Sequence, residues 1–115
     1  MATLDVTYPS IPLYLIYNPE LVRGMMRPIF HYAKSEAWPY PFAPHDCGQY
    51  PLCNGQVYGN NELKYQMPVE ECGNAILPVA AATRADGDRA LAEENRDILQ
   101  AWADYLVEYG YNPEN

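Results

Sequence analysis

The sequence predicts a mainly α-helical protein of about three helices with long ordered loops between them. Apolar residues recur at helical spacing in separate stretches of the chain. Two prolines, Pro19 and Pro68, are each followed closely by acidic residues, a pattern typical of helix N-termini. Turn signals such as Asn54-Gly55 fall between the predicted helices and indicate loops there.

Length and composition indicate one small globular domain. The chain has 115 residues, of which 49% are hydrophobic, and this is enough to build a core of that size. Its formal net charge of -8 disfavours nucleic acid and anionic membrane surfaces as partners. No apolar run approaches the length that spans a bilayer, and the N-terminus does not look like a signal peptide. We therefore expect a soluble chain.

The first two elements are predicted from their prolines. The segment from Asp5 to Tyr17 contains two prolines among β-branched and aromatic residues, so we expect packed coil there. Asn18-Pro19-Glu20 then supplies an N-cap, a proline at the first helical position and an acid, and predicts a helix to about Ser35. Pro28 should kink it. Its expected apolar face is Leu21, Met25, Ile29 and Tyr32.

The segment from Ala37 to Ala43, A-W-P-Y-P-F-A, cannot be helical because its prolines alternate with aromatic residues. Its side chains Trp38, Tyr40 and Phe42 should form a rigid wall. Two interpretations remain open at this point, namely ordinary core packing and a platform on which sugar rings stack.

Two further helices are predicted after the long loop. One begins near Met67-Pro68 and runs to about Thr83 with almost no charge, so we expect it to be buried nearly all round. Gly87 ends it and Asp88 caps the next helix, which stops at Gly110. The last helix is amphipathic, with apolar positions Leu91, Ile98, Leu99, Trp102, Tyr105, Leu106 and Tyr109.

The loop from Pro44 to Glu71 holds most of the residues suited to chemistry. Hydrolysis of an amide or a glycosidic bond needs one group that donates a proton and another that activates water, and Asp46, Glu70 and Glu71 are carboxylates of this kind. Glu70 and Glu71 are neighbours on a helix, so their side chains diverge by about 100°. One can serve a site while the other caps the helix, and capping could also explain both acids.

Cysteine spacing supports neither a zinc finger nor a disulfide framework. The count of three is odd and no C-x-x-C occurs, so we favour free, buried cysteines and leave a Cys47–Cys53 bridge open. His31, His45 and Asp46 are also metal-ligand types, but their spacing indicates no metal site. Calcium held by oxygen atoms is not excluded by spacing.

Three blocks of sequence resemble the glutaminase A family: Y-P-S-I-P-L-Y-L-I-Y-N-P-E-L, P-F-A-P-H-D-C-G-Q-Y-P-L-C-N-G-Q-V-Y-G and M-P-V-E-E-C-G-N-A-I-L. The resemblance covers nearly the whole chain. It implies that residues 1–115 are a fragment of a catalytic domain of the six-hairpin (α/α) toroid type, which many glycoside hydrolases share. It also implies a secreted or periplasmic parent protein. The fragment's partners would then be the remainder of the parent chain, or other copies of itself.

The family motifs carry over onto two groups of residues, one in the loop and one at the second helix. The implied catalytic residues are Asp46, Glu70 and Glu71, and the implied substrate-binding residues are His45, Tyr50 and Asn74. Trp38 is a further substrate-binding candidate, as a ring on which a sugar can stack. The family name implies hydrolysis of L-glutamine to glutamate and ammonia, without a cofactor. A glycoside hydrolase and a structural module without activity of its own are the alternatives.

Overall fold

The computed structural model describes residues 2–56 and 61–111. The regular elements in these ranges are all helices, and no strand occurs there. The helices are α1 (Leu4–Tyr17), α2 (Pro19–Ala33), α3 (Pro68–Asp86), α4 (Ala90–Glu94) and α5 (Arg96–Tyr109), with a short 3-10 turn, η1 (Leu63–Tyr65). The predicted mainly α class is therefore confirmed. No helix in these ranges is long and apolar enough to cross a bilayer.

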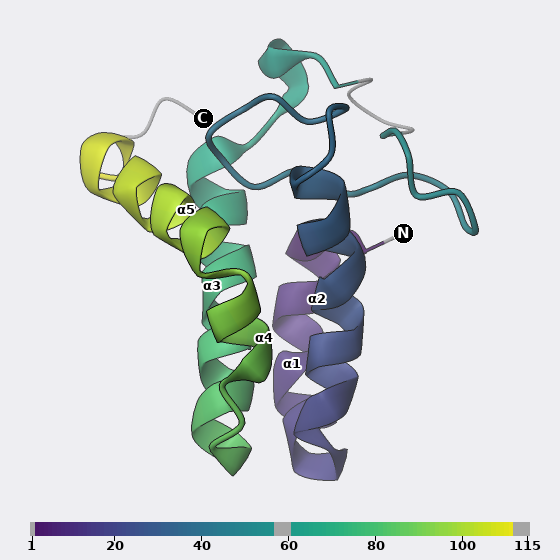
Figure 1. Ribbon diagram of the computed structural model, residues 1–115, viewed down its shortest axis with the longest axis vertical. Helices are drawn as coiled ribbons and strands as arrows, with labels where there is room; N and C mark the ends of the chain where they lie inside the picture. Colours follow the sequence, from purple (N-terminus) through teal and green to yellow (C-terminus); the bar gives the residue numbers. More distant parts are fainter. Residues whose placement is uncertain (1, 57–60, 112–115) are drawn as a thin grey trace.

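The helices form two hairpins that pack side by side (Figure 1). In one hairpin α1 and α2 run in opposite directions, joined at Asn18, and in the other α3 turns back at Gly87 into α4 and α5. Helix α3 contacts α1, α2 and α5. Segments 34–56 and 61–67 lie over the end of the bundle where α1 and α3 begin. Both helix N-termini therefore meet the long loop at one end of the molecule.

The prediction of packed coil before Asn18 is wrong, because Leu4–Tyr17 is a helix that contains Pro9 and Pro12. Each proline removes one backbone donor from the helix. Helix α1 nevertheless buries Leu4, Thr7 and Ile11, which follow helical spacing, and it packs against both α2 and α3. Tertiary packing therefore outweighs the local preference of the two prolines.

Helix α2 begins where predicted, with the Asn18 side chain accepting a hydrogen bond from the Glu20 N–H at 3.0 Å. The helix runs through Pro28 and ends at Ala33. Its apolar face was only partly predicted, because Leu21 is exposed whereas Ile29 and Tyr32 are buried. The buried residues are Val22, Arg23, Met26, Ile29, Phe30 and Tyr32.

Helix α3 also begins at the predicted proline, and it ends at Gly87, whose φ of 75° is left-handed. Burial nearly all round was wrong, since the Leu77 side chain is 51% exposed. The single helix expected after Asp88 is also wrong, because the chain is interrupted at Asn95 between α4 and α5. Asn95 is buried and donates a hydrogen bond to the Leu91 carbonyl at 2.9 Å. The predicted cap at Asp88 is off by one residue, because the N-cap of α4 is Arg89, although Asp88 accepts a hydrogen bond from the Ala90 N–H at 3.0 Å.

Aromatic side chains fill the main core beneath the long loop. Phe30 of α2 stacks on Trp102 of α5 with ring centroids 5.6 Å apart. Trp38 is 3% exposed and its indole N–H donates to the Phe42 carbonyl at 2.7 Å, while Tyr40 and Phe42 stack on one another. The aromatic side chains of 37–43 thus pack in or against the core, whereas Pro39 and Pro41 are exposed.

The other end of the bundle is closed by a buried arginine. Arg23 donates to both carboxylate oxygens of Asp86, and also to the carbonyls of Ala82 and Asp88 at 3.0 and 3.1 Å. Because the guanidinium matches a carboxylate with two parallel bonds, it ties the start of α2 to the end of α3.

Candidate functional site

The long loop places His45 against the first turn of α3. The His45 Nδ1 atom lies 2.8 Å from Oε1 of Glu71, whose side chain is fully buried. Asn74, one turn further along α3, donates to Oε2 of the same carboxylate at 3.4 Å. The His45 carbonyl accepts from the Leu4 N–H at 2.9 Å, which joins the loop to the start of α1. Three of the residues expected at the site therefore converge.

Asp5 is a fourth member of this cluster that sequence reasoning missed. It lies in the first turn of α1, and its Oδ1 is 4.0 Å from His45 Nε2. That oxygen is buried and has no hydrogen-bond partner among the described residues. An acid in the first turn is a recognised sign of a helix N-terminus. Asp5 could not be recognised by this sign, because the segment that holds it was interpreted as coil.

Burial and hydrogen bonding act in opposite directions on the His45–Glu71 pair. Burial raises the pKa of the Glu71 carboxyl to about 7, although hydrogen bonds from His45 and Asn74 oppose that change. Burial alone would lower the pKa of His45, but the hydrogen bond and the charge of Glu71, followed by Asp5 and Asp46, raise it overall. The pKa of Glu71 thus lies close to neutral pH and that of His45 is raised, and perturbed pKa values of this kind are typical of proton-transferring groups.

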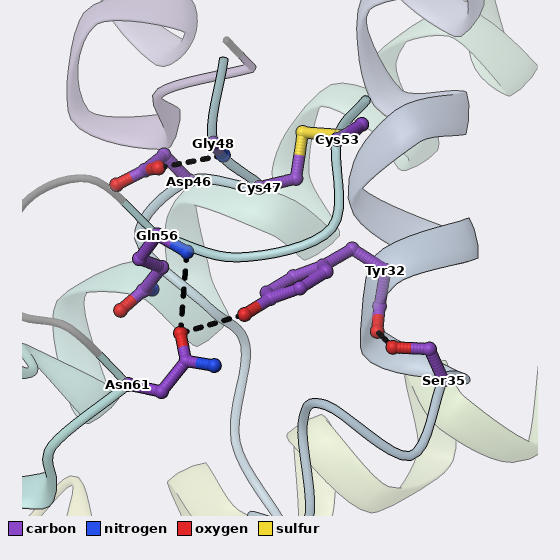
Figure 2. The surroundings of a disulfide bond; sticks show 8 residues. All are labelled: Tyr32, Ser35, Asp46, Cys47, Gly48, Cys53, Gln56 and Asn61. Atoms are coloured by element: carbon purple, nitrogen blue, oxygen red, sulfur yellow. Dashed lines mark hydrogen bonds between the residues drawn. A yellow bond between two sulfur atoms is a disulfide. The ribbon is translucent and has the colours of Figure 1, made fainter. Parts of the chain in front are cut away.

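Asp46 lies beside this pair in a loop that folds back on itself. Its Oδ1 accepts from the Gly48 N–H at 2.9 Å, and its Oδ2 is buried without a hydrogen-bond partner in the described ranges (Figure 2). Gly48 has a φ of 104°, and a Cβ there would lie 2.0 Å from the Gly55 carbonyl oxygen. Only glycine fits this position, so Gly48 fixes the turn that holds Asp46.

A disulfide between Cys47 and Cys53 closes this loop, with their Cα atoms 5.0 Å apart (Figure 2). The preference for three free cysteines was wrong for this pair, because the turn at Gly48 brings them within bonding distance. Cys72 is free and buried, as predicted, and accepts a hydrogen bond from the Ala43 N–H. The bridge also removes Cys47 and Cys53 from the candidate metal ligands.

A polar network connects the loop to α2 on its other side. The Tyr32 hydroxyl donates to Asn61 Oδ1 at 2.6 Å, and the Gln56 N–H donates to the same oxygen at 3.3 Å (Figure 2). The Asn61 amide in turn donates to the Ala37 carbonyl at 3.2 Å. The loop residues on both sides of 57–60 are therefore anchored to the helical core.

The remaining predicted site residues lie apart from the cluster. Glu70 is exposed, so the two adjacent acids diverge as expected, with Glu71 the inward one. Tyr50 is 83% exposed on the disulfide-closed loop, and Trp38 is buried in the aromatic core. Roles in catalysis or substrate binding stay predictions for all seven residues.

Comparison with known proteins gives consistent results. The family model of the glutaminase A six helical-hairpin domain matches residues 1–115. Glutaminase A of Aspergillus oryzae is 35% identical over 116 residues, which cover 100% of this chain and 16% of that protein. A protein of Arthroderma benhamiae named "Probable glutaminase" is 36% identical over 76 residues, or 65% of this chain and 8% of that protein. No solved structure matches the chain significantly.

The chain thus spans 16% of the Aspergillus protein and 8% of the Arthroderma protein. The two hairpins described above agree with a domain made of six such units, whereas closure into a toroid stays a prediction. The match over all 115 residues and the identity along the whole chain lead to one conclusion. The chain belongs to the glutaminase A six helical-hairpin family.

Proposed function

We propose that this chain is part of the catalytic domain of a hydrolase that converts L-glutamine to glutamate and ammonia. Family membership and the names of the relatives support the reaction. The observation that carries the site assignment is the 2.8 Å contact between His45 and the buried Glu71 carboxylate. Such a pair can take a proton from water and return it to a leaving nitrogen.

The two side chains of the pair differ in burial, and this difference indicates a separate role for each. The His45 side chain is 21% exposed, whereas that of Glu71 is 0% exposed, so His45 is the member that a substrate can reach. Glu71 orients the ring through Nδ1 and is itself braced by Asn74. Asp46, next to His45 in the chain, supplies a second carboxylate whose buried Oδ2 accepts no hydrogen bond among the described residues.

The reaction is to be tested in a longer protein, because the chain matches only 16% of the Aspergillus protein. We propose that the rest of the domain packs on a groove between α1 and α3. This groove has a volume of about 340 Å³ and is lined mainly by apolar side chains, among them Tyr8, Ile11, Pro12, Leu15, Leu77 and Pro78. The isolated chain should then be inactive, and ammonia release by it would contradict this part of the proposal.

In the longer protein, His45→Gln, Glu71→Gln and Asp46→Asn should each lower the rate of ammonia release from glutamine by at least about 10². Glu93→Gln, at an exposed acid of α4 outside the predicted site, is the matched control and should retain the activity. Wild-type rates in the first three variants, with folding checked by circular dichroism, would reject the assignment. Release of reducing sugar from an oligosaccharide panel without ammonia would favour the glycoside hydrolase instead.

We also propose that the parent protein works outside the cytoplasm, as a secreted or periplasmic protein. The Cys47–Cys53 disulfide supports this location, because such bonds persist in oxidising compartments and are rare in reducing ones. Thiol titration of this segment, taken from protein isolated from its natural compartment, should find Cys72 as the free cysteine. Three titratable thiols would contradict the proposal.

A further inference from the structure

Three residues that can bind a metal ion come together from three separate segments. Asp5 comes from the first turn of α1, His45 from the long loop and Glu71 from the first turn of α3. One ligand atom of each lies within 4.8 Å of those of the other two. His45 Nδ1 lies 2.8 Å from Glu71 Oε1, and His45 Nε2 lies 4.0 Å from Asp5 Oδ1.

The charges in this cluster are not balanced by its own members. Two carboxylates meet one imidazole, and Glu71 is fully buried, where an ionised carboxylate needs a compensating partner. A protonated His45 can serve Glu71 through Nδ1. It cannot also serve Asp5, because 4.0 Å is too long for a hydrogen bond and leaves the buried Asp5 Oδ1 without a partner among the described residues.

We propose that Asp5, His45 and Glu71 bind a divalent transition-metal ion, with Zn²⁺ as the best-fitting ion. One imidazole nitrogen and two carboxylates are a donor set that zinc accepts, whereas magnesium and calcium favour oxygen ligands throughout. Three protein ligands leave the fourth tetrahedral position open for water or for a substrate oxygen. The ion would balance both carboxylates at once.

The cluster can reach the required geometry through Asp5. Ligand atoms on a tetrahedral zinc with bonds near about 2.0 Å lie about 3.3 Å apart, so the cluster has to contract by up to about 1.5 Å. Asp5 is half-buried and its Oδ1 is held by no hydrogen bond in the described ranges, so this side chain is the one that is free to move. The ion would take the place of the proton between His45 and Glu71, so zinc binding should release that proton to solvent and block the proton transfer proposed for this pair.

The experiment is calorimetric titration of this chain with zinc chloride near neutral pH, with magnesium chloride as the control ion. We expect one zinc per chain, little heat with magnesium, and a zinc-dependent rise in Tm. Asp5→Asn, His45→Gln and Glu71→Gln should each weaken zinc binding by at least about tenfold. Since Asp5 is half-buried, Asp5→Asn retains the fold and tests the site even where the Glu71 variant unfolds.

Two matched variants repeat the same chemical changes outside the cluster. Glu70→Gln and His31→Gln both alter exposed side chains and should leave the zinc affinity unchanged. No binding up to about 1 mM zinc, the limit for a weak site, or equal losses in the control variants would overturn the proposal. Zinc binding is measured without substrate, so its outcome is separate from the test of glutamine hydrolysis.

Discussion

The buried carboxyl of Glu71 should make the stability of this chain decrease as the pH rises. Burial raises its pKa from 4.5 to about 7 in the folded chain. A group whose pKa is higher in the folded chain than in the unfolded chain stabilises the fold. This contribution is complete below the unfolded pKa and is lost as the pH rises through the folded pKa. The difference between the two pKa values corresponds to roughly 3 kcal/mol, at about 1.36 kcal/mol for each unit.

His45 acts in the same direction, because its pKa is also raised in the folded chain. Its contribution is present below its ordinary pKa of 6.5 and is lost above the raised value. Asp86 does not interfere in this range, since its lowered pKa of about 2 affects stability only at more acidic pH. The interval from about pH 4.5 to above pH 7 therefore reports on the His45–Glu71 pair.

The assay is urea unfolding across this interval with a chelator present. The free energy of unfolding of the wild type should decrease by roughly 3 kcal/mol from the acidic to the alkaline end. Glu71→Gln removes the titrating group while keeping its shape, so most of the decrease should disappear. Glu70→Gln is the control and should keep the wild-type slope, because Glu70 is exposed.

Two results would refute the reasoning. A wild-type stability that is constant or increases over this interval would mean that Glu71 is not held in a raised-pKa environment. A slope that Glu70→Gln flattens as much as Glu71→Gln would mean that the effect comes from general charge repulsion in a chain with net charge -8.

Three other perturbations test the scaffold. Asp86→Asn should lower Tm at neutral pH by leaving Arg23 without its carboxylate. Because the pKa of Asp86 is lowered to about 2, this stabilisation is present above pH 3.8 and is lost in the wild type as the pH falls through 2, which a pH series of melting curves measures. Reducing the Cys47–Cys53 disulfide should lower the free energy of unfolding by about 2 kcal/mol, as expected for so short a loop. Urea unfolding with and without dithiothreitol would show this. Trp38→Ala should destabilise the chain by about 3–5 kcal/mol because it empties a buried aromatic site, and chemical denaturation measures this.

Each of these perturbations has a control in the same chain. Asp97→Asn changes an exposed acid and should leave the acid sensitivity unchanged. Cys72→Ala should leave the effect of dithiothreitol intact, since Cys72 is not part of the bridge. Tyr50→Ala alters an exposed ring. Its effect on stability should therefore be no more than about 0.5 kcal/mol. Equal effects in a variant and its control would contradict the structural assignment concerned.

The start of α2 and the end of α3 could be predicted because their signals are local. Asn18 with Pro19 and the turn at Gly87 act through hydrogen bonds and backbone angles of neighbouring residues, and the structure confirms them. The helical state of Leu4–Tyr17 could not be predicted in this way, because it depends on packing against α2 and α3. Asp5 was missed for the same reason, since its place in a first turn follows only once α1 is known to be a helix.

In the candidate site, too, features set by neighbouring residues could be predicted, whereas features set by tertiary packing could not. Sequence could predict that Glu70 and Glu71 point in different directions, but which one faces the core depends on how α3 is rotated against its neighbours. The disulfide likewise depends on the fold of the loop, because the left-handed Gly48 and the approach of Gly55 set the distance between Cys47 and Cys53.

The two ends of the helical bundle differ in how their charges are compensated. At the end where α3 stops, Asp86 would be unfavourable beside the negative pole of the helix, but Arg23 neutralises it with two hydrogen bonds. At the opposite end, the positive poles of α1 and α3 favour the negative charges of Asp5 and Glu71. The buried Asp5 oxygen still lacks a hydrogen bond in the described ranges. Among the described residues no arginine compensates the two acids at this end as Arg23 compensates Asp86, and this contrast supports the proposal that His45 and the two acids bind an ion.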